Sequence, residues 1–124
     1  MERLGMDFLR LEDEGLFKFL GVPAVRTDRS LLDLLDLVLE YADSMGALRL
    51  VIDPVTPLLM GLTHLEARTV VHGMLMRSSR IRGLTVLMVL DLTPGIDSHH
   101  DVLRYLVDGL ISLEVAYTRG GVLR

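Results

Sequence analysis

The sequence predicts an α/β fold, a three-layer sandwich with a mostly parallel sheet. Two observations support this class. Apolar residues recur at helical spacing in two long segments, 28–46 and 63–81. Runs of branched apolar residues at 48–53 and 84–92 follow these segments, and short loops join them, which is typical of parallel strands connected through helices. No linker, repeat or low-complexity segment interrupts the chain, so we expect a single domain over residues 1–124.

The clearest predicted helix covers residues 28–46. Asp28 or Ser30 can cap its start and Gly46 its end, and the acids lie mainly outside its apolar face. That face contains Leu31, Leu34, Leu35, Val38, Leu39 and Ala42. Upstream, the run LFKFLGV at 16–22 follows a glycine and is a short strand candidate.

The two central strand candidates read LRLVID (48–53) and LTVLMVLDL (84–92). Their apolar residues are continuous rather than alternating, as expected for strands covered on both faces. After the segment PVTP, the second long helix is predicted over 63–81. Thr63 is its candidate cap, and arginines near its carboxyl end suit the helix dipole.

The last third of the chain is predicted from shorter signals. Proline, glycine and small polar residues indicate a loop at 93–101. A short helix at 101–107 and a third strand, DGLISLEV, at 108–115 follow. The RGG sequence at 119–121 then forms a turn into the terminal VLR.

The composition limits the classes of protein to which the chain can belong. Half of the residues are hydrophobic and the mean hydropathy is +0.41, both high for a soluble protein. The longest stretch without an acid, lysine or arginine, 54–65, is shorter than the roughly 20 apolar residues that span a bilayer and contains two prolines. The N-terminus is acidic and shows no export signal, so we expect a cytoplasmic protein without a membrane span. The absence of cysteine excludes disulfides and thiolate chemistry.

Charge is distributed unevenly along the chain. The net charge of −4 argues against nucleic-acid binding over the whole surface. Residues 1–46 hold ten acids against five bases, whereas residues 63–82 hold four arginines against one acid. Arg77, Arg80 and Arg82 therefore form a candidate basic patch. Two interpretations stay open: the arginines are solvated surface charges, or they form a small nucleic-acid-binding site.

Each central strand ends in an acid, Asp53 after LRLVI and Asp91 after LTVLMVL. Ligands of parallel α/β sheets bind outside the carboxyl ends of the strands. A carboxylate at the end of a buried strand is costly unless water, a donor or a cation meets it. The two acids are therefore candidate site residues, and the alternative is that each accepts loop amides or caps the next helix.

Four segments resemble one known family. ALRLVIDPVTPLL (47–59), GLTVLMVLDL (83–92) and LRYLVDGLISLEV (103–115), with the RGG that follows, resemble the second half of a KaiC-like domain of the RecA superfamily of ATPases. LGMDFLRLEDEGLFKFL (4–20) is similar to the segment before it. The resemblance covers nearly the full length and implies a truncated RecA-like, P-loop-like core.

The resemblance also assigns expected roles. Asp53 occupies the Walker B position, where the family's aspartate holds magnesium, and Pro54 replaces the hydroxyl residue that often follows. Asp91 lies near the end of the strand that carries a polar sensor of the terminal phosphate. Asp108 and Gly109 match a turn that we interpret as structural.

The phosphate-binding part of that family is not found in these 124 residues. A Walker A loop, G-x-x-x-x-G-K-[ST], wraps phosphates with backbone amides and reaches them with its lysine. The only lysine, Lys18, lies in LFKFL with no glycine loop before it, and the family's catalytic glutamates lie upstream of the matched region. We therefore expect no catalytic residue, no autonomous ATP hydrolysis and no cofactor bound by the chain alone, with Mg-ATP bound only if a partner completes the site.

The family's sheet order has a further consequence. Its phosphate-loop strand lies between the strands matched by 84–92 and 108–115, and its catalytic-glutamate strand lies between those matched by 16–22 and 48–53. Without them, either the remaining strands close up or apolar edges stay open to a partner. We expect a homo-oligomer or docking on a complete KaiC-like ATPase. The alternatives are a partner-dependent magnesium-nucleotide-binding ATPase subunit, a small nucleic-acid-binding protein and a truncated reading frame.

Overall fold

The structure is a computed structural model that describes residues 5–21, 28–91, 100–113, 116–118 and 121–123. The described helices are α1 (Phe8–Asp13), α2 (Asp28–Ser44), α3 (Thr56–Leu59), α4 (His64–Ser78) and α5 (His100–Leu103). The described strands are β1 (Arg49–Ile52), β2 (Thr85–Met88), β3 (Ala116–Thr118) and β4 (Gly121–Leu123).

Strands β1 and β2 form the central sheet. They pair in parallel, from Arg49 opposite Thr85 to Ile52 opposite Met88. Backbone bonds extend the pair at both ends, because the Thr85 N–H donates to the Leu48 carbonyl and the Val89 N–H to the Ile52 carbonyl, each at 2.9 Å. The predicted α/β class with parallel central strands is confirmed.

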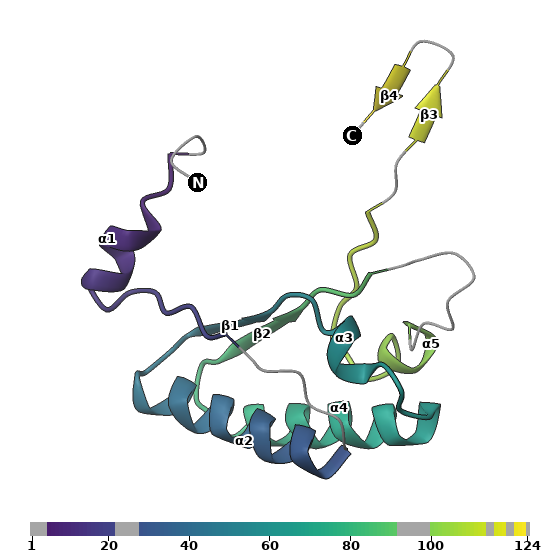
Figure 1. Ribbon diagram of the computed structural model, residues 1–124, viewed down its shortest axis with the longest axis horizontal. Helices are drawn as coiled ribbons and strands as arrows, with labels where there is room; N and C mark the ends of the chain where they lie inside the picture. The colour runs from purple at the N-terminus through teal and green to yellow at the C-terminus, as the bar shows by residue number, and fades with distance from the viewer. Residues whose placement is uncertain (1–4, 22–27, 92–99, 114–115, 119–120, 124) are drawn as a thin grey trace.

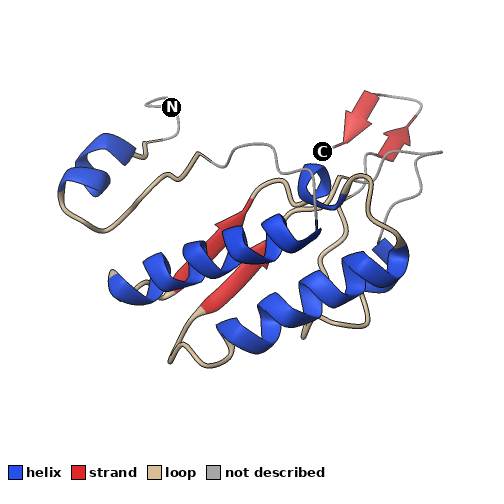
Figure 2. Ribbon diagram, turned by 60° about the horizontal axis from the view of Figure 1, so that its bottom comes forward, coloured by secondary structure: helices blue, strands red, loops and turns tan. Residues whose placement is uncertain are grey.

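Helices α2 and α4 lie side by side along one face of this sheet (Figures 1 and 2). The buried cluster between them contains Leu31, Leu35, Leu39, Val55, Leu59, Ala67, Val70, Val71, Met74 and Leu103. Every second residue of β1 and β2 packs against this cluster from the sheet side. These residues are Leu50, Ile52, Val86 and Met88. The core is therefore a single layer of side chains between two helices and one sheet face.

The two long helices begin and end close to the predicted positions. Beyond α2, Gly46 has a φ of +65°, which favours glycine, and the Ala47 N–H donates to the Ala42 carbonyl at 2.8 Å. The side chains of Asp28 and Ser30 lie outside the described residues, so the predicted cap of α2 stays a prediction. Helix α4 ends at Ser78, three residues before the predicted end, so Arg80 lies in the turn that leads to β2.

Helix α4 starts with a capping box. The Glu66 N–H donates to Thr63 Oγ1 at 3.3 Å, and the Thr63 N–H and hydroxyl both donate to Glu66 Oε2 at 2.7 Å. The pKa of Glu66 is lowered because the Thr63 backbone N–H, and then its hydroxyl, bond to the ionised carboxylate. The predicted Thr63 cap is confirmed, and these bonds fix where α4 begins.

The second face of the sheet differs from the prediction. The central strands were expected to be covered on both faces, but Val51 is 57% exposed and its register partner Leu87 is 53% exposed. A run of apolar residues predicts burial, but it does not by itself provide the layer that would cover the second face of the sheet. Among the described residues this face stays open, and the third layer of the sandwich stays a prediction.

Two predicted strands do not form in the described residues. Residues 16–21 and 108–113 contain no strand, and residues 22 and 114–115 lie outside the described ranges. Branched apolar residues favour a strand where a neighbouring strand pairs with them, and neither segment has such a neighbour in the part of the chain that the structure describes. The described chain instead contains an antiparallel β3–β4 hairpin, in which Thr118 lies opposite Gly121. Residues 119–120 of the predicted turn lie outside the description.

Other differences are smaller. Helix α5 (His100–Leu103) covers only residues 101–103 of the predicted helix 101–107, and turns and bends follow it. Most of the predicted loop 93–101, namely residues 93–99, lies outside the described residues. The four-residue helix α3 was not predicted. None of the described helices combines the length and apolarity needed to cross a bilayer.

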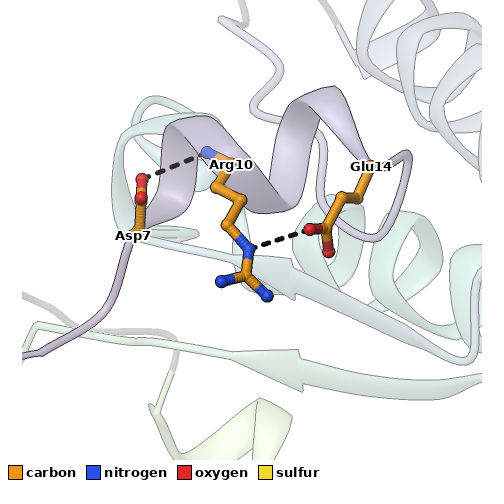
Figure 3. A network of polar contacts seen from close by, with 3 residues as sticks. All are labelled: Asp7, Arg10 and Glu14. Atoms are coloured by element: carbon orange, nitrogen blue, oxygen red, sulfur yellow. Dashed lines mark hydrogen bonds and ion pairs between the residues drawn. The ribbon is translucent and has the colours of Figure 1, made fainter.

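The N-terminal segment 5–21 is held together by its own contacts. Asp7 caps α1 by accepting from the Arg10 N–H at 3.1 Å, and Arg10 Nε forms an ion pair with Glu14 at 2.8 Å (Figure 3). Lys18 Nζ lies 2.7 Å from Glu12 Oε1, and this hydrogen bond raises the pKa of the lysine. The only lysine of the chain is therefore paired with an acid.

Candidate functional site at the carboxyl edge of the sheet

Asp53 lies at the turn where β1 ends. The Asp53–Pro54 peptide bond is cis, and the next residue, Val55, donates its N–H to the Val89 carbonyl at 2.8 Å. The chain leaving β1 therefore crosses directly to the end of β2. Val55 is buried in the core while Asp53 is exposed, so the turn presents the carboxylate to solvent.

A second bond joins the ends of the two strands. Thr56, the first residue of α3, accepts the Asp91 N–H on its hydroxyl at 2.9 Å. Leu59 is almost fully buried and anchors α3 to the core. Asp53 and Asp91 thus extend from one carboxyl edge, as predicted, and Thr56 holds the β2 end of that edge in place.

The alternative role for the two acids, accepting hydrogen bonds from loop amides or capping the next helix, is not seen in the described part of the chain. Neither carboxylate accepts a hydrogen bond or forms an ion pair with a described residue. Val55 precedes α3 as its cap, so Asp53 does not cap the helix that follows it, and Asp91 lies nine residues before α5 begins at His100. Both carboxylates are exposed.

The donor chemistry of this edge suits a hard cation. Magnesium favours carboxylate oxygens, usually keeps several waters, and is commonly bound by one or two carboxylates together with substrate phosphates. Asp53 and Asp91 would provide such ligands. Within the described ranges, no group of three or more histidine or acidic side chains is arranged to hold a metal.

The candidate basic patch is divided by an ion pair. Arg77 Nη1 pairs with Asp36 Oδ1 and so joins α4 to α2. Arg80 and Arg82 are exposed in the turn before β2 and form no ion pair with the described residues. One of the three arginines thus contributes to helix packing, and the other two remain available to a ligand or partner.

Sequence reasoning missed two residues of this region. Thr56 was treated as part of a connection, although a proline directly after it is a signal for the first turn of a helix. Asp36 is one of the acids that lie mainly outside the apolar face of α2. Its partner is 41 residues away along the chain, and no local pattern marks such a pair.

Comparison with known families agrees with this description. The family model described as ATPase: KaiC matches residues 1–124, which includes both strand-end acids. No curated protein and no solved structure gives a significant match.

Proposed function

Because the chain belongs to the KaiC family of ATPases, we propose that it acts as a non-catalytic interaction domain. It associates with itself or docks on a complete KaiC-like ATPase. The observation that carries this proposal is the open apolar face of the central sheet.

The open face is defined by Val51 and Leu87, which lie opposite each other in the register. Both are more than half exposed, and the exposed pair Arg49 and Thr85 shares this face. Parallel sheets occur almost only with both faces covered, and burying an exposed valine or leucine fully contributes about 1.5–3 kcal/mol. Covering this face with protein is therefore favourable.

The charges around the sheet support a role without autonomous catalysis. Phosphate transfer needs a cationic lysine beside a cradle of backbone amides. Lys18 is bonded to Glu12 in the N-terminal segment, and the 124 residues contain no Walker A sequence. The only lysine of the chain is thus paired with Glu12 in the N-terminal segment, and no contact among the described residues joins it to the acids of the carboxyl edge.

Light scattering over a wide concentration range tests this proposal. We expect the mass of the unmodified chain, alone or with a complete KaiC-like ATPase, to increase with concentration. Leu87→Gln should weaken that association about tenfold, because it removes the apolar contact made by one buried leucine side chain. Leu65→Gln is the matched control, because Leu65 is 74% exposed on α4, in the helical layer. A chain that stays monomeric and does not bind the ATPase would refute the proposal.

A second candidate function is favoured by the shared edge of Asp53 and Asp91. In this alternative the chain is a partner-dependent ATPase subunit, and Asp53 holds magnesium while the partner supplies the phosphate cradle and the catalytic glutamate. Asp53→Asn should then abolish nucleotide turnover by the mixture while circular dichroism stays unchanged. Asp43→Asn, an exposed acid on α2, is the control. Equal turnover with both variants would exclude this role.

A further inference from the structure

Among the described residues, the outer edges of β1 and β2 and the apolar segment 109–113 have no strand pairing. Among the described residues β2 pairs only with β1, so its other edge presents free backbone N–H and C=O groups. Residues 109–113, GLISL, form no backbone hydrogen bond with other described residues. Within this segment Ile111 is 82% exposed and Leu113 is 88% exposed. An apolar extended segment and an unpaired edge complement each other.

We propose that residues 109–113 of one copy add as a parallel strand to the free edge of β2 in a second copy. This inference rests on the proposed function, since it identifies the interaction partner as another copy of the same chain. It specifies the segment, the edge and the direction of pairing.

Charge complementarity fixes the direction. Asp108 directly precedes the segment, Arg82 lies before β2 and Asp91 lies after it, and none of the three forms an ion pair with the described residues. A parallel strand brings Asp108 beside Arg82. An antiparallel strand brings it beside Asp91, and like charges at neighbouring positions destabilise a sheet.

The side-chain pattern fixes the register. Ile111 and Leu113 alternate with Ser112, so the two apolar residues share one face of the added strand. They join Val86 and Met88 on the helix-covered face when Leu110 lies opposite Thr85. In this register Asp108 lies opposite Gly83, next to Arg82. The free edge of β1 offers no such match, because Ala47 would then face Asp108.

The geometry of the chain favours a second copy over the same copy. Leu103 is buried and Leu106 packs on the same cluster, and Figure 1 places α5 on the side where β1 and β2 end. A parallel strand must begin at the opposite end of β2, about 13 Å away for four residues. The four steps from Leu106 to Leu110 span roughly 14 Å only when fully extended, whereas residues 104–108 form turns and bends. A segment from another copy has no such limit.

Exchanging the two charges tests the inference. Arg82→Glu places like charges together at every contact between identical copies, and so does Asp108→Arg. We expect each variant alone to raise the dissociation constant by about tenfold, from the loss of an ion pair and the gain of a repulsion. An equimolar mixture of the two variants should restore association, because each copy then meets the opposite charge on its partner. Only contacts between copies allow rescue by mixing.

The possible results separate this inference from the proposed function. Association that Leu87→Gln weakens but neither charge variant changes would overturn the inference and leave the proposed function standing. Variants that weaken association without rescue by mixing would also overturn it. A chain that never associates, alone or with an ATPase, would remove both.

Disulfide trapping provides a second measurement that does not depend on repulsion. The chain has no cysteine, so single substitutions give unambiguous products. Neighbouring strands lie about 4.8 Å apart, within the range that a disulfide bridges. A mixture of Thr85→Cys and Leu110→Cys should form a mixed disulfide dimer on oxidation, whereas Leu65→Cys mixed with Leu110→Cys should not. Equal yields from the two mixtures would overturn the inference.

Discussion

The two faces of the β1–β2 sheet use the same residue types for opposite purposes. Leu50, Ile52, Val86 and Met88 point toward α2 and α4 and complete the core, whereas Val51 and Leu87 alternate with them and remain more than half exposed. Since side chains alternate across a strand, a single run of apolar residues supplies both faces. The difference shows that apolar character alone does not separate residues that stabilise the fold from residues available to a partner.

The largest expected effect comes from truncating a core side chain and comparing it with the same truncation in the exposed segment 109–113. Leu31→Ala removes a side chain that is 1% exposed in the cluster between the helices and the sheet, and should lower the free energy of unfolding by about 2–5 kcal/mol. Leu113→Ala in the exposed segment should change it by less than roughly 0.5 kcal/mol. Urea unfolding of the dilute chain measures both values. Similar losses in the two variants would show that the exposed segment belongs to the core.

A substitution in α4 should stabilise the fold and tests how closely α2 and α4 pack. Gly73 lies inside α4, and an added Cβ would meet only the Leu32 side chain, at an ordinary contact distance of 3.7 Å. Gly73→Ala should therefore raise the free energy of unfolding by about 0.5–1 kcal/mol, the difference in helix propensity. Thermal unfolding followed by circular dichroism would detect this as a higher midpoint. A lower midpoint would mean that α2 and α4 pack too closely for a methyl group.

The ion pair between Asp36 and Arg77 should contribute less. Both side chains are substantially exposed, so a double-mutant cycle with Asp36→Asn and Arg77→Gln should give a coupling of about 0.2–1 kcal/mol. The coupling should shrink in 1 M salt, which screens exposed charges. A coupling that salt leaves unchanged would contradict an exposed pair.

The smallest expected effect is a pH dependence at the start of α4. Because the pKa of Glu66 is lower in the folded chain than in the unfolded chain, its contribution is fully present above its ordinary value near 4.3. It is lost as the pH falls through the lower folded value. Glu66→Gln should flatten the stability profile in that acidic range and leave its slope near neutral pH unchanged. An unchanged acidic slope would show that the capping box does not persist in solution.

Local sequence signals predicted the helical layer well. Periodicity located α2 and α4, and Thr63 and Gly46 marked two of their ends, because these signals depend on residues within one or two turns. The strands β1 and β2 and their parallel direction were also predictable. The edge shared by Asp53 and Asp91 followed from the rule that parallel strands end together.

What could not be predicted depends on pairing between distant segments. Residues 16–21 have the composition of a strand, but strand formation needs a neighbour that no local pattern identifies. The same reason explains 108–113, whose apolar residues stay exposed. The bond from the Asp91 N–H to Thr56 and the pairing of Arg77 with Asp36 each join elements that meet only in the folded chain.

The alternating backbone bonds of β2 make its free edge visible to amide hydrogen exchange. Thr85 and Val89 donate their N–H groups to β1, so by the period of two the N–H groups of Val86 and Met88 point to the unpaired edge. In the isolated chain, these two amides should exchange with solvent far faster than those of Thr85 and Val89. Slow exchange at Val86 and Met88 that appears only at high protein concentration would report, residue by residue, that a strand has occupied that edge.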